Sequence, residues 1–360
     1  MSEKRKMASI QIIEDIKEIP GALNVELVRV LGWNILAVKN QFKVGQLAVF
    51  YEVDSIVPDQ PVYEFLRPRN FRIKIMKSPR LGVISQGLLM PITDVIPEKY
   101  LSDEYANSNS ADEFKNQLVG RDVTELLGVE KYEIPYEGGK NTMPLGMFPE
   151  HIVPKTDELR IQSYPNLLQE LWGLPYVIRM KYDGTSFTCF SFREESGICS
   201  RNLQLKETDN DVYWKIAHKY DLPKKLNEYC KLTDLDLAIQ GEIIGPIVIH
   251  GGKNPLNTTV DDLYLFSVYN IRERCYMDDV VAESIAACLG IKFVSLIEKG
   301  DFFKYTLEEL EFKVKGLLYY STNNLAEGFV VRPQHYTYSP MIGRQLSFKV
   351  INPEYSLLEK

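Results

Sequence analysis

The sequence predicts an α+β protein of two domains, a small β-barrel followed by a domain of antiparallel sheets with flanking helices. Three observations support this. The first hundred residues contain short apolar segments separated by turns, and residues after about 150 alternate such segments with helical patterns. The stretch between them is rich in glycine and proline. A chain of 360 residues also has the length of about two domains of roughly 150 residues each.

The N-terminal part has the pattern of a small barrel. Residues 25–40 and 45–53 are rich in β-branched and aromatic residues, and we expect further strands over 71–76 and 86–92. About five short strands with little helix fit a barrel of the OB type, although an SH3-like barrel would give a similar pattern. We therefore expect an OB-fold domain over residues 1–135.

Residues 136–150 have the composition of a linker, which places the second domain at 151–360. In that domain, apolar residues recur at helical spacing within 210–230 and 277–289, and Thr306 with Glu309 forms a capping box that opens a further helix. Strand patterns flank these helices and predict largely antiparallel sheet: 176–182, 186–192, 237–243, 263–271, 327–333 and 345–351.

Composition and charge exclude several classes of protein. The net charge of −7 argues against non-specific coating of nucleic acid. The five cysteines form no CxxC pair and the four histidines are scattered, so we expect neither a zinc site nor a disulfide framework, and a reducing compartment fits. Since no signal peptide or membrane-spanning run is visible, we expect a cytoplasmic or nuclear protein with no membrane partner.

The candidate site consists of polar residues on apolar strands. Burying charges on strand after strand is costly unless the charges converge on one another or on a ligand. No P-loop, Rossmann or protein-kinase motif is present. The residues that we expect to converge are Lys181, Asp183, Arg201, Glu242, Glu327 and Lys349.

Such a set suits nucleotidyl transfer through a lysine. At a reference pKa of about 10.4, only roughly one lysine in a thousand is neutral near pH 7, so the site must lower the pKa of Lys181. A hydrated Mg²⁺ or the second lysine, Lys349, would do so. Asp183, Glu242 and Glu327 would hold the metal through oxygen or through its waters. Lys349, and Arg201 more loosely, would neutralise the transferring phosphate or grip the ribose, and Gly184 lets the chain turn sharply beside the nucleotide.

The motifs KYDGTS, CSRN, GEIIG, YLFSVYNI, EGFVVRP and SFKVIN, in that order, resemble those of the covalent nucleotidyltransferases, the ATP-dependent ligases and mRNA capping enzymes. The resemblance covers 151–360 and implies a nucleotidyltransferase (ligase adenylation) domain in which Lys181 carries AMP. The N-terminal half resembles the OB domain of one group of RNA-repair ligases, notably at VDSIVPD (53–59) and at 72–92. The segment PKTDELRIQ (154–162) also resembles that group.

This resemblance implies an ATP-dependent RNA ligase with an N-terminal OB domain, acting as a monomer. Its co-substrate would be ATP with Mg²⁺ or Mn²⁺, and its substrate RNA with 5′-phosphate and 3′-hydroxyl ends. Arg160 would help to hold the nucleotide, Phe266 and Val330 would lie on the two faces of the adenine, and Glu242 and Arg201 would lie near the ribose. One departure is Ser347, which stands where many relatives have the first of two lysines, so Lys349 would be alone at the phosphate.

Other interpretations stay open. Phe266 could be a core aromatic and Arg160 a surface residue. A capping-type enzyme using GTP, a DNA-directed nucleotidyltransferase or a non-catalytic OB-containing nucleic-acid-binding protein are the alternative functions. The N-terminal half also holds a basic stretch, which would contact RNA or the ATP phosphates or else be a solvated face: Arg69, Arg72, Lys74, Lys77 and Arg80.

Overall fold

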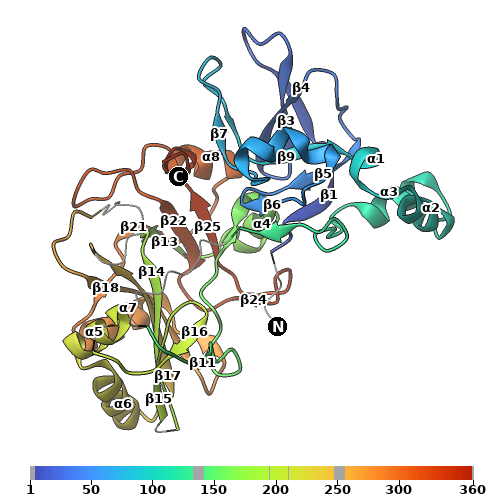
Figure 1. Cartoon of the computed structure of the whole chain (residues 1–360). Helices are drawn as coiled ribbons and strands as arrows, with labels where there is room; N and C mark the ends of the chain where they lie inside the picture. Colours follow the sequence, from blue (N-terminus) through green and yellow to red (C-terminus); the bar gives the residue numbers. More distant parts are fainter. Residues whose placement is uncertain (1–4, 133–141, 194, 210, 247–255, 359–360) are drawn as a thin grey trace. The chain divides into compact units, whose positions relative to one another are not determined.

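The computed structural model describes residues 5–132, 142–193, 195–209, 211–246 and 256–358. The chain forms two compact units (Figure 1). The smaller unit takes up the described parts of 4–136, with 162–165 and 356–360, and the larger unit those of 137–161 and 166–355. The expectation of an α+β protein is confirmed, since both units combine helices with mainly antiparallel sheet.

The smaller unit contains two three-stranded sheets. Strand β5 (Leu47–Tyr51) lies between β1 (Ala8–Ile12) and β9 (Leu88–Pro91), and β3 (Val25–Val30) lies between β2 (Asp15–Glu18) and β4 (Trp33–Val38). Buried and half-buried residues alternate along β3, as one covered sheet face requires. Two short pairs complete the sheet structure, β6 (Ser55–Ile56) with β10 (Glu130–Lys131) and β7 (Met76–Lys77) with β8 (Ile84–Ser85).

The helices of this unit are short: η1 (Pro61–Arg69), α1 (Ile92–Val95), α2 (Glu98–Ala106) and α3 (Ala111–Leu118). The strand expected over 71–76 is wrong for most of its length. Asn70 and Phe71 adopt positive φ angles of 50° and 58°, which interrupt an extended chain, and Arg72 makes only an isolated bridge to Ile56. Arg72 and Lys74 therefore do not share the face of a strand.

The larger unit has one eight-stranded and one five-stranded sheet. The first has the order β11-β16-β15-β14-β17-β18-β19, with β20 also paired to β18. Its strands are β11 (Pro144–Met147), β14 (Thr185–Phe192), β15 (Glu195–Cys199), β16 (Leu203–Leu205), β17 (Leu237–Ile244), β18 (Asp262–Asn270), β19 (Cys275–Tyr276) and β20 (Lys292–Phe293). Strand β11 lies inside the segment expected to be a linker, of which 136–141 fall outside the described residues.

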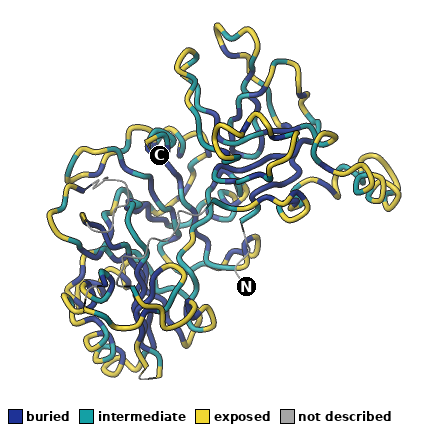
Figure 2. Tube along the Cα trace, in the orientation of Figure 1, coloured by how far each residue is buried: buried dark blue, intermediate teal, exposed yellow. Residues whose placement is uncertain are grey.

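The second sheet has the order β12-β25-β22-β13-β21. Its strands are β12 (Leu159–Arg160), β13 (Tyr176–Lys181), β21 (Leu296–Gly300), β22 (Gly328–Pro333) and β25 (Phe348–Ile351). A short hairpin pairs β23 (Tyr338–Ser339) with β24 (Arg344–Gln345). In Figure 2 the buried positions follow the strands of both sheets.

Helices cover the eight-stranded sheet. Helices α5 (Val212–Tyr220), α6 (Leu222–Thr233) and α7 (Asp279–Leu289) pack through Ile216, Leu226 and Ile285 on a cluster with strand residues such as Phe187. The expected capping box is confirmed, because Thr306 and Glu309 cap α8 (Leu307–Val314) reciprocally. The remaining helices are η2 (Ile161–Ser163), α4 (Leu167–Leu171) and α9 (Pro353–Ser356). Among the helices of the described residues, none has both the length and the apolar character to span a membrane.

Candidate active site

Lys181 is the last residue of β13, and it lies opposite Gly328, the first residue of β22. Its Nζ donates a hydrogen bond to Glu327 Oε2 at 2.6 Å. Gly328 has a φ of +153°, and a Cβ there would come within 2.1 Å of the Val350 carbonyl oxygen. The glycine therefore allows β25 to approach the strand pair that carries the lysine.

The pKa of this lysine is influenced by three carboxylates. Burial lowers the pKa of Lys181, but Glu327, Glu242 and Asp183 together outweigh burial and hold that pKa well above its ordinary value. In the protein without bound ligands, the site therefore raises the pKa of Lys181, and the expected lowering of this pKa by Mg²⁺ or Lys349 stays a prediction for the loaded enzyme. Burial raises the pKa of Glu327, against the effect of Lys181 and Lys349. Any depression of the lysine pKa must come from cations that arrive with a ligand.

Glu242 faces this cluster from β17 of the other sheet. Burial, with Glu327 and Asp183, raises the pKa of Glu242 to about 8, against the opposing effect of Lys181. Gly184 is packed against the same strand, where a Cβ would lie 2.2 Å from the Ile243 carbonyl oxygen. Glycine is thus required at this position by the close approach of β17.

The raised pKa of Glu242 leads to a pH-dependent prediction. In the folded protein Glu242 keeps its proton up to about pH 8. In the unfolded chain the same side chain loses its proton at the ordinary, lower carboxyl pKa. The stabilisation from this group is complete below the unfolded pKa and is lost as the pH rises through the folded one. In metal-free buffer we expect Glu242→Gln to unfold thermally a few degrees above the wild type near pH 8.5, with no difference near pH 5. The control is Glu228→Gln, an exposed position on α6, and equal midpoints at both pH values would contradict the prediction.

Asp183 is held by a residue that the sequence did not single out. The hydroxyl of Tyr355, a buried residue of α9, donates to Asp183 Oδ2. A second tyrosine, Tyr319, donates to the Lys181 carbonyl oxygen at 3.1 Å and accepts from the Glu327 amide at 3.2 Å. The sequence analysis found the other site residues because each is a charged residue on an apolar strand. Neither tyrosine is of that kind.

We expect Tyr355→Phe to slow nucleotide attachment about tenfold at constant pH. A hydrogen bond to a charged group contributes about 1.5–3 kcal/mol, and its loss lets the Asp183 carboxylate turn. The rate of label transfer from ATP to the protein measures this effect. Tyr320→Phe, at an exposed tyrosine, is the matched control. An unchanged rate in Tyr355→Phe would show that the orientation of Asp183 is immaterial.

The five-stranded sheet brings three more predicted residues together. Lys349 in β25 lies opposite Val330 in β22 on one side and opposite Arg160 in β12 on the other. Paired residues share a sheet face, and Val330 lies two residues from Gly328, the partner of Lys181. Lys181, Val330, Lys349 and Arg160 therefore lie on one face of this sheet.

Two predicted residues come from the other sheet and its loops. Phe266 in β18 is half-buried and packs beside a cluster that includes Met180 and Val294. Arg201, just after β15, is exposed and forms an ion pair with Asp157. Phe266 thus packs beside β13, the strand that ends at Lys181, whereas Arg201 is joined to the segment that precedes β12.

Ser347 belongs to a buried polar network that the sequence analysis missed. Its Oγ donates to Glu158 Oε1 at 2.8 Å and accepts from Arg332 Nε at 3.0 Å, and Arg332 Nη2 donates to the same carboxylate oxygen at 2.8 Å. Burial disfavours the Glu158 carboxylate, but Arg332 and Arg344 outweigh burial and lower its pKa. The serine thus hydrogen-bonds to both members of the Arg332–Glu158 ion pair.

The basic stretch of the smaller unit is divided by the structure. Arg72 forms an ion pair with Asp54 at 2.7 Å, and its guanidinium lies 3.5 Å from the centre of the Tyr132 ring. Arg72 thus binds other residues of its own unit. Arg69, Lys77 and Arg80 are exposed, although Arg69 contacts Met76, and Lys74 is half-buried.

The chemistry of the site fits a hard cation. Glu242, Glu327 and Asp183 offer oxygen donors of the kind that Mg²⁺ and Mn²⁺ bind. In the part of the chain that the structure describes, no three acidic, histidine or cysteine side chains are grouped closely enough to coordinate one ion directly. A metal would therefore need ligands from water or phosphate in addition to these carboxylates.

Comparison with known proteins identifies the larger unit and part of the smaller one. The model of the family described as RNA ligase matches residues 174–351, and a model of an OB-fold domain matches 7–92. The structure of Naegleria gruberi RNA ligase with PPi has a TM-score of 0.81 and 28% identity, with 99% of each chain covered. The chain belongs to the RNA ligase family. The expectation of an RNA ligase, an enzyme preceded by an OB domain, is confirmed.

Other structures similar to this ligase carry nucleotides. A Naegleria gruberi RNA ligase mutant with ATP and Mn matches at 28% identity and a TM-score of 0.80, covering 99% of this chain and 98% of that one. Another mutant, with AMP and Mn, matches at 28% identity and a TM-score of 0.81, with 98% of each chain covered. Among curated proteins, no sequence matches the ligase.

Proposed function

We propose that this ligase seals an RNA 5′-phosphate to a 3′-hydroxyl with ATP as co-substrate, and that Lys181 is the residue that becomes adenylated. The observation that carries the proposal is the amine of Lys181 at a strand end, 2.6 Å from Glu327 and under the electrostatic influence of Glu242 and Asp183. A buried lysine among carboxylates, in an enzyme that joins RNA ends, is suited to covalent nucleotide transfer.

The reaction consists of three displacements. In the first, Lys181 Nζ, after losing its proton, attacks the α-phosphate of ATP, and pyrophosphate leaves. In the second, an oxygen of the RNA 5′-phosphate attacks that phosphorus, the N–P bond breaks and the amine of Lys181 is released. In the third, the 3′-hydroxyl loses its proton as its oxygen attacks the activated 5′-phosphate, and AMP leaves.

Each side chain of the site has a separate role in this reaction. A divalent cation held by Glu242, Glu327 and Asp183 would neutralise phosphate charge and lower the pKa of Lys181. Lys349, beside Val330, lies on the same sheet face as Lys181 and neutralises the transferring phosphate. Phe266 and Val330 pack on the base, and the nucleotide is also held by Arg160 in β12 and by Arg201 just after β15.

ATP and a divalent metal are supported by the similar structures, which bear ATP with Mn, AMP with Mn, or PPi. In the smaller unit, Arg69, Lys74, Lys77 and Arg80 are the candidates for contact with RNA phosphates or the ATP tail, while Arg72 is already paired with Asp54. All five cysteines are free thiols, which fits the reducing conditions of the cytoplasm or nucleus. We propose that the ligase acts as a monomer.

The test is incubation with ATP labelled at the α-phosphate and a divalent metal, followed by denaturing electrophoresis and intact-mass analysis. A labelled, acid-labile adduct of one AMP per chain is expected from ATP and not from GTP. Chasing the adduct with nicked RNA that carries a 5′-phosphate and a 3′-hydroxyl should release the label as AMP and join the strands. An unlabelled protein whose mass also excludes prior adenylation would overturn the proposal, and labelling by GTP would favour a capping-type enzyme.

A further inference from the structure

The strand that carries Phe266 contains an irregularity at that residue. Along the β17–β18 ladder, Gln240 lies opposite Ser267, but the next residue, Gly241, lies opposite Leu265. Phe266 is therefore the extra residue of a β-bulge, without a cross-strand partner of its own. Bulges redirect side chains and leave one residue outside the regular ladder, so such a residue needs other contacts to hold its orientation.

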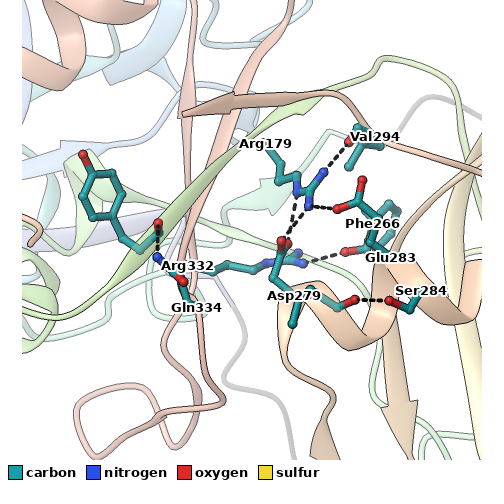
Figure 3. Close-up of polar contacts among 10 residues, drawn as sticks. Arg179, Phe266, Asp279, Glu283, Ser284, Val294, Arg332 and Gln334 are labelled. Atoms are coloured by element: carbon teal, nitrogen blue, oxygen red, sulfur yellow. Dashed lines mark hydrogen bonds and ion pairs between the residues drawn. The ribbon is translucent and has the colours of Figure 1, made fainter. Parts of the chain in front are cut away.

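Arg332 supplies such a contact from the other sheet. Its Nη1 donates to the Phe266 carbonyl oxygen at 2.8 Å, as Figure 3 shows. The other two guanidinium nitrogens bind Glu158 and Ser347, as described above. Only 14% of the Arg332 side chain is exposed, so its charge is compensated mainly by Glu158. A planar guanidinium whose three nitrogens are all bonded has little freedom to turn.

This network also explains the serine at position 347. Serine both donates to Glu158 and accepts from Arg332. A lysine ammonium there would have no acceptor for Arg332 Nε and would bring a second positive charge against the guanidinium. Serine at position 347, where many relatives have a lysine, is therefore compatible with Arg332 as its neighbour, whereas a lysine would not be.

The network also lies beside an open cavity. Phe266, Arg332, Glu158 and Ser347 line a cleft of about 690 Å³, together with Gln240 and Ser267 from the two strands around the bulge. Arg332 thus binds the backbone of a residue that lines this cavity and packs beside Met180, the residue before Lys181 in β13. A shift of this arginine would move the ring relative to a bound ligand.

We propose that Arg332 is a positioning residue, which with Glu158 and Ser347 fixes the bulged Phe266 so that its ring is ready to receive the nucleotide base. The inference rests on the proposed function, because it needs Phe266 to stack on that base. Arg332 itself does not touch the reacting atoms. Its effect is on how well the base is received, and therefore on the ATP concentration at which Lys181 becomes adenylated.

The experiment measures single-turnover adenylation of Lys181 over a range of ATP concentrations. We expect Arg332→Gln to raise the half-saturating ATP concentration about tenfold and to change the rate at saturation less than about threefold. Ser347→Ala, which leaves the Glu158 and Phe266 contacts in place, should shift the ATP concentration in the same direction by a smaller factor. The control is Arg193→Gln, an exposed arginine of the same unit.

A double-mutant cycle separates positioning from a general loss of structure. If Arg332 acts through Phe266, Arg332→Gln should add less than about a twofold change in a Phe266→Leu background, whereas independent effects would multiply. Multiplying effects, or an unchanged ATP dependence in both Arg332→Gln and Ser347→Ala, would overturn the inference. If Arg332→Gln does not fold, Arg332→Lys and Ser347→Ala serve in the same cycle. Absence of a lysyl-AMP in the wild type would instead show that the proposed function has failed.

Discussion

Lys181→Ala should give a folded protein that forms no covalent adduct with ATP. Its amine is the only atom in our mechanism that can form the bond to the α-phosphate, so adduct formation should fall by more than about 10³-fold. The variant also removes the cation that lowers the pKa of Glu327 and of Glu242, so these two carboxyls should hold more protons at neutral pH. Intact mass after incubation with ATP and metal measures the adduct directly.

The same variant should still use RNA that is already adenylylated at its 5′ end. In the third displacement the lysine is no longer the nucleophile, so sealing of such RNA should survive at a reduced rate. Lys304→Ala, at an exposed lysine of the larger unit, is the matched control and should label normally. A labelled Lys181→Ala protein would place the adduct on another residue and refute our assignment.

Part of this site was predictable because charge on an apolar strand needs a partner. Lys181 and Glu327 are 146 positions apart, yet their contact follows from the cost of burying either one alone. The family resemblance added Val330, which the sheet register places opposite Lys349. Segment type was equally predictable where the period was strong, as at α7 and in the capping box of α8.

The remaining features depend on tertiary contacts that leave no periodic signal. Tyr355 reaches Asp183 from a helix of four residues after the last strand, and nothing in its local sequence marks it. The pKa of Lys181 is raised because three carboxylates act on it, and the number of carboxylates near the lysine could not be predicted from the sequence. The strand expected at 71–76 failed because two residues adopt positive φ there, and Arg72 pairs with Asp54 instead.

Glu327→Gln should test whether this carboxylate acts through the charge state of Lys181. We expect nucleotide attachment at pH 7.5 to fall by about 10- to 100-fold, because an uncharged amide oxygen orients the amine less firmly than the charged carboxylate that it contacts at 2.6 Å. Glu327→Ala, which cannot accept a hydrogen bond, should lose about tenfold more. Glu228→Gln is the exposed control and should keep the wild-type rate.

The pH dependence of that variant distinguishes electrostatics from simple misplacement. Burial lowers the pKa of Lys181, and Glu327 is the largest of the influences that raise it. Removing the Glu327 charge should therefore lower the pKa of Lys181, so that the neutral amine becomes available at lower pH. In single-turnover adenylation at saturating ATP and metal, the rising limb of the rate against pH should shift to lower pH in Glu327→Gln. A slower enzyme with an unshifted limb would show that Glu327 orients the nucleophile without controlling its protonation.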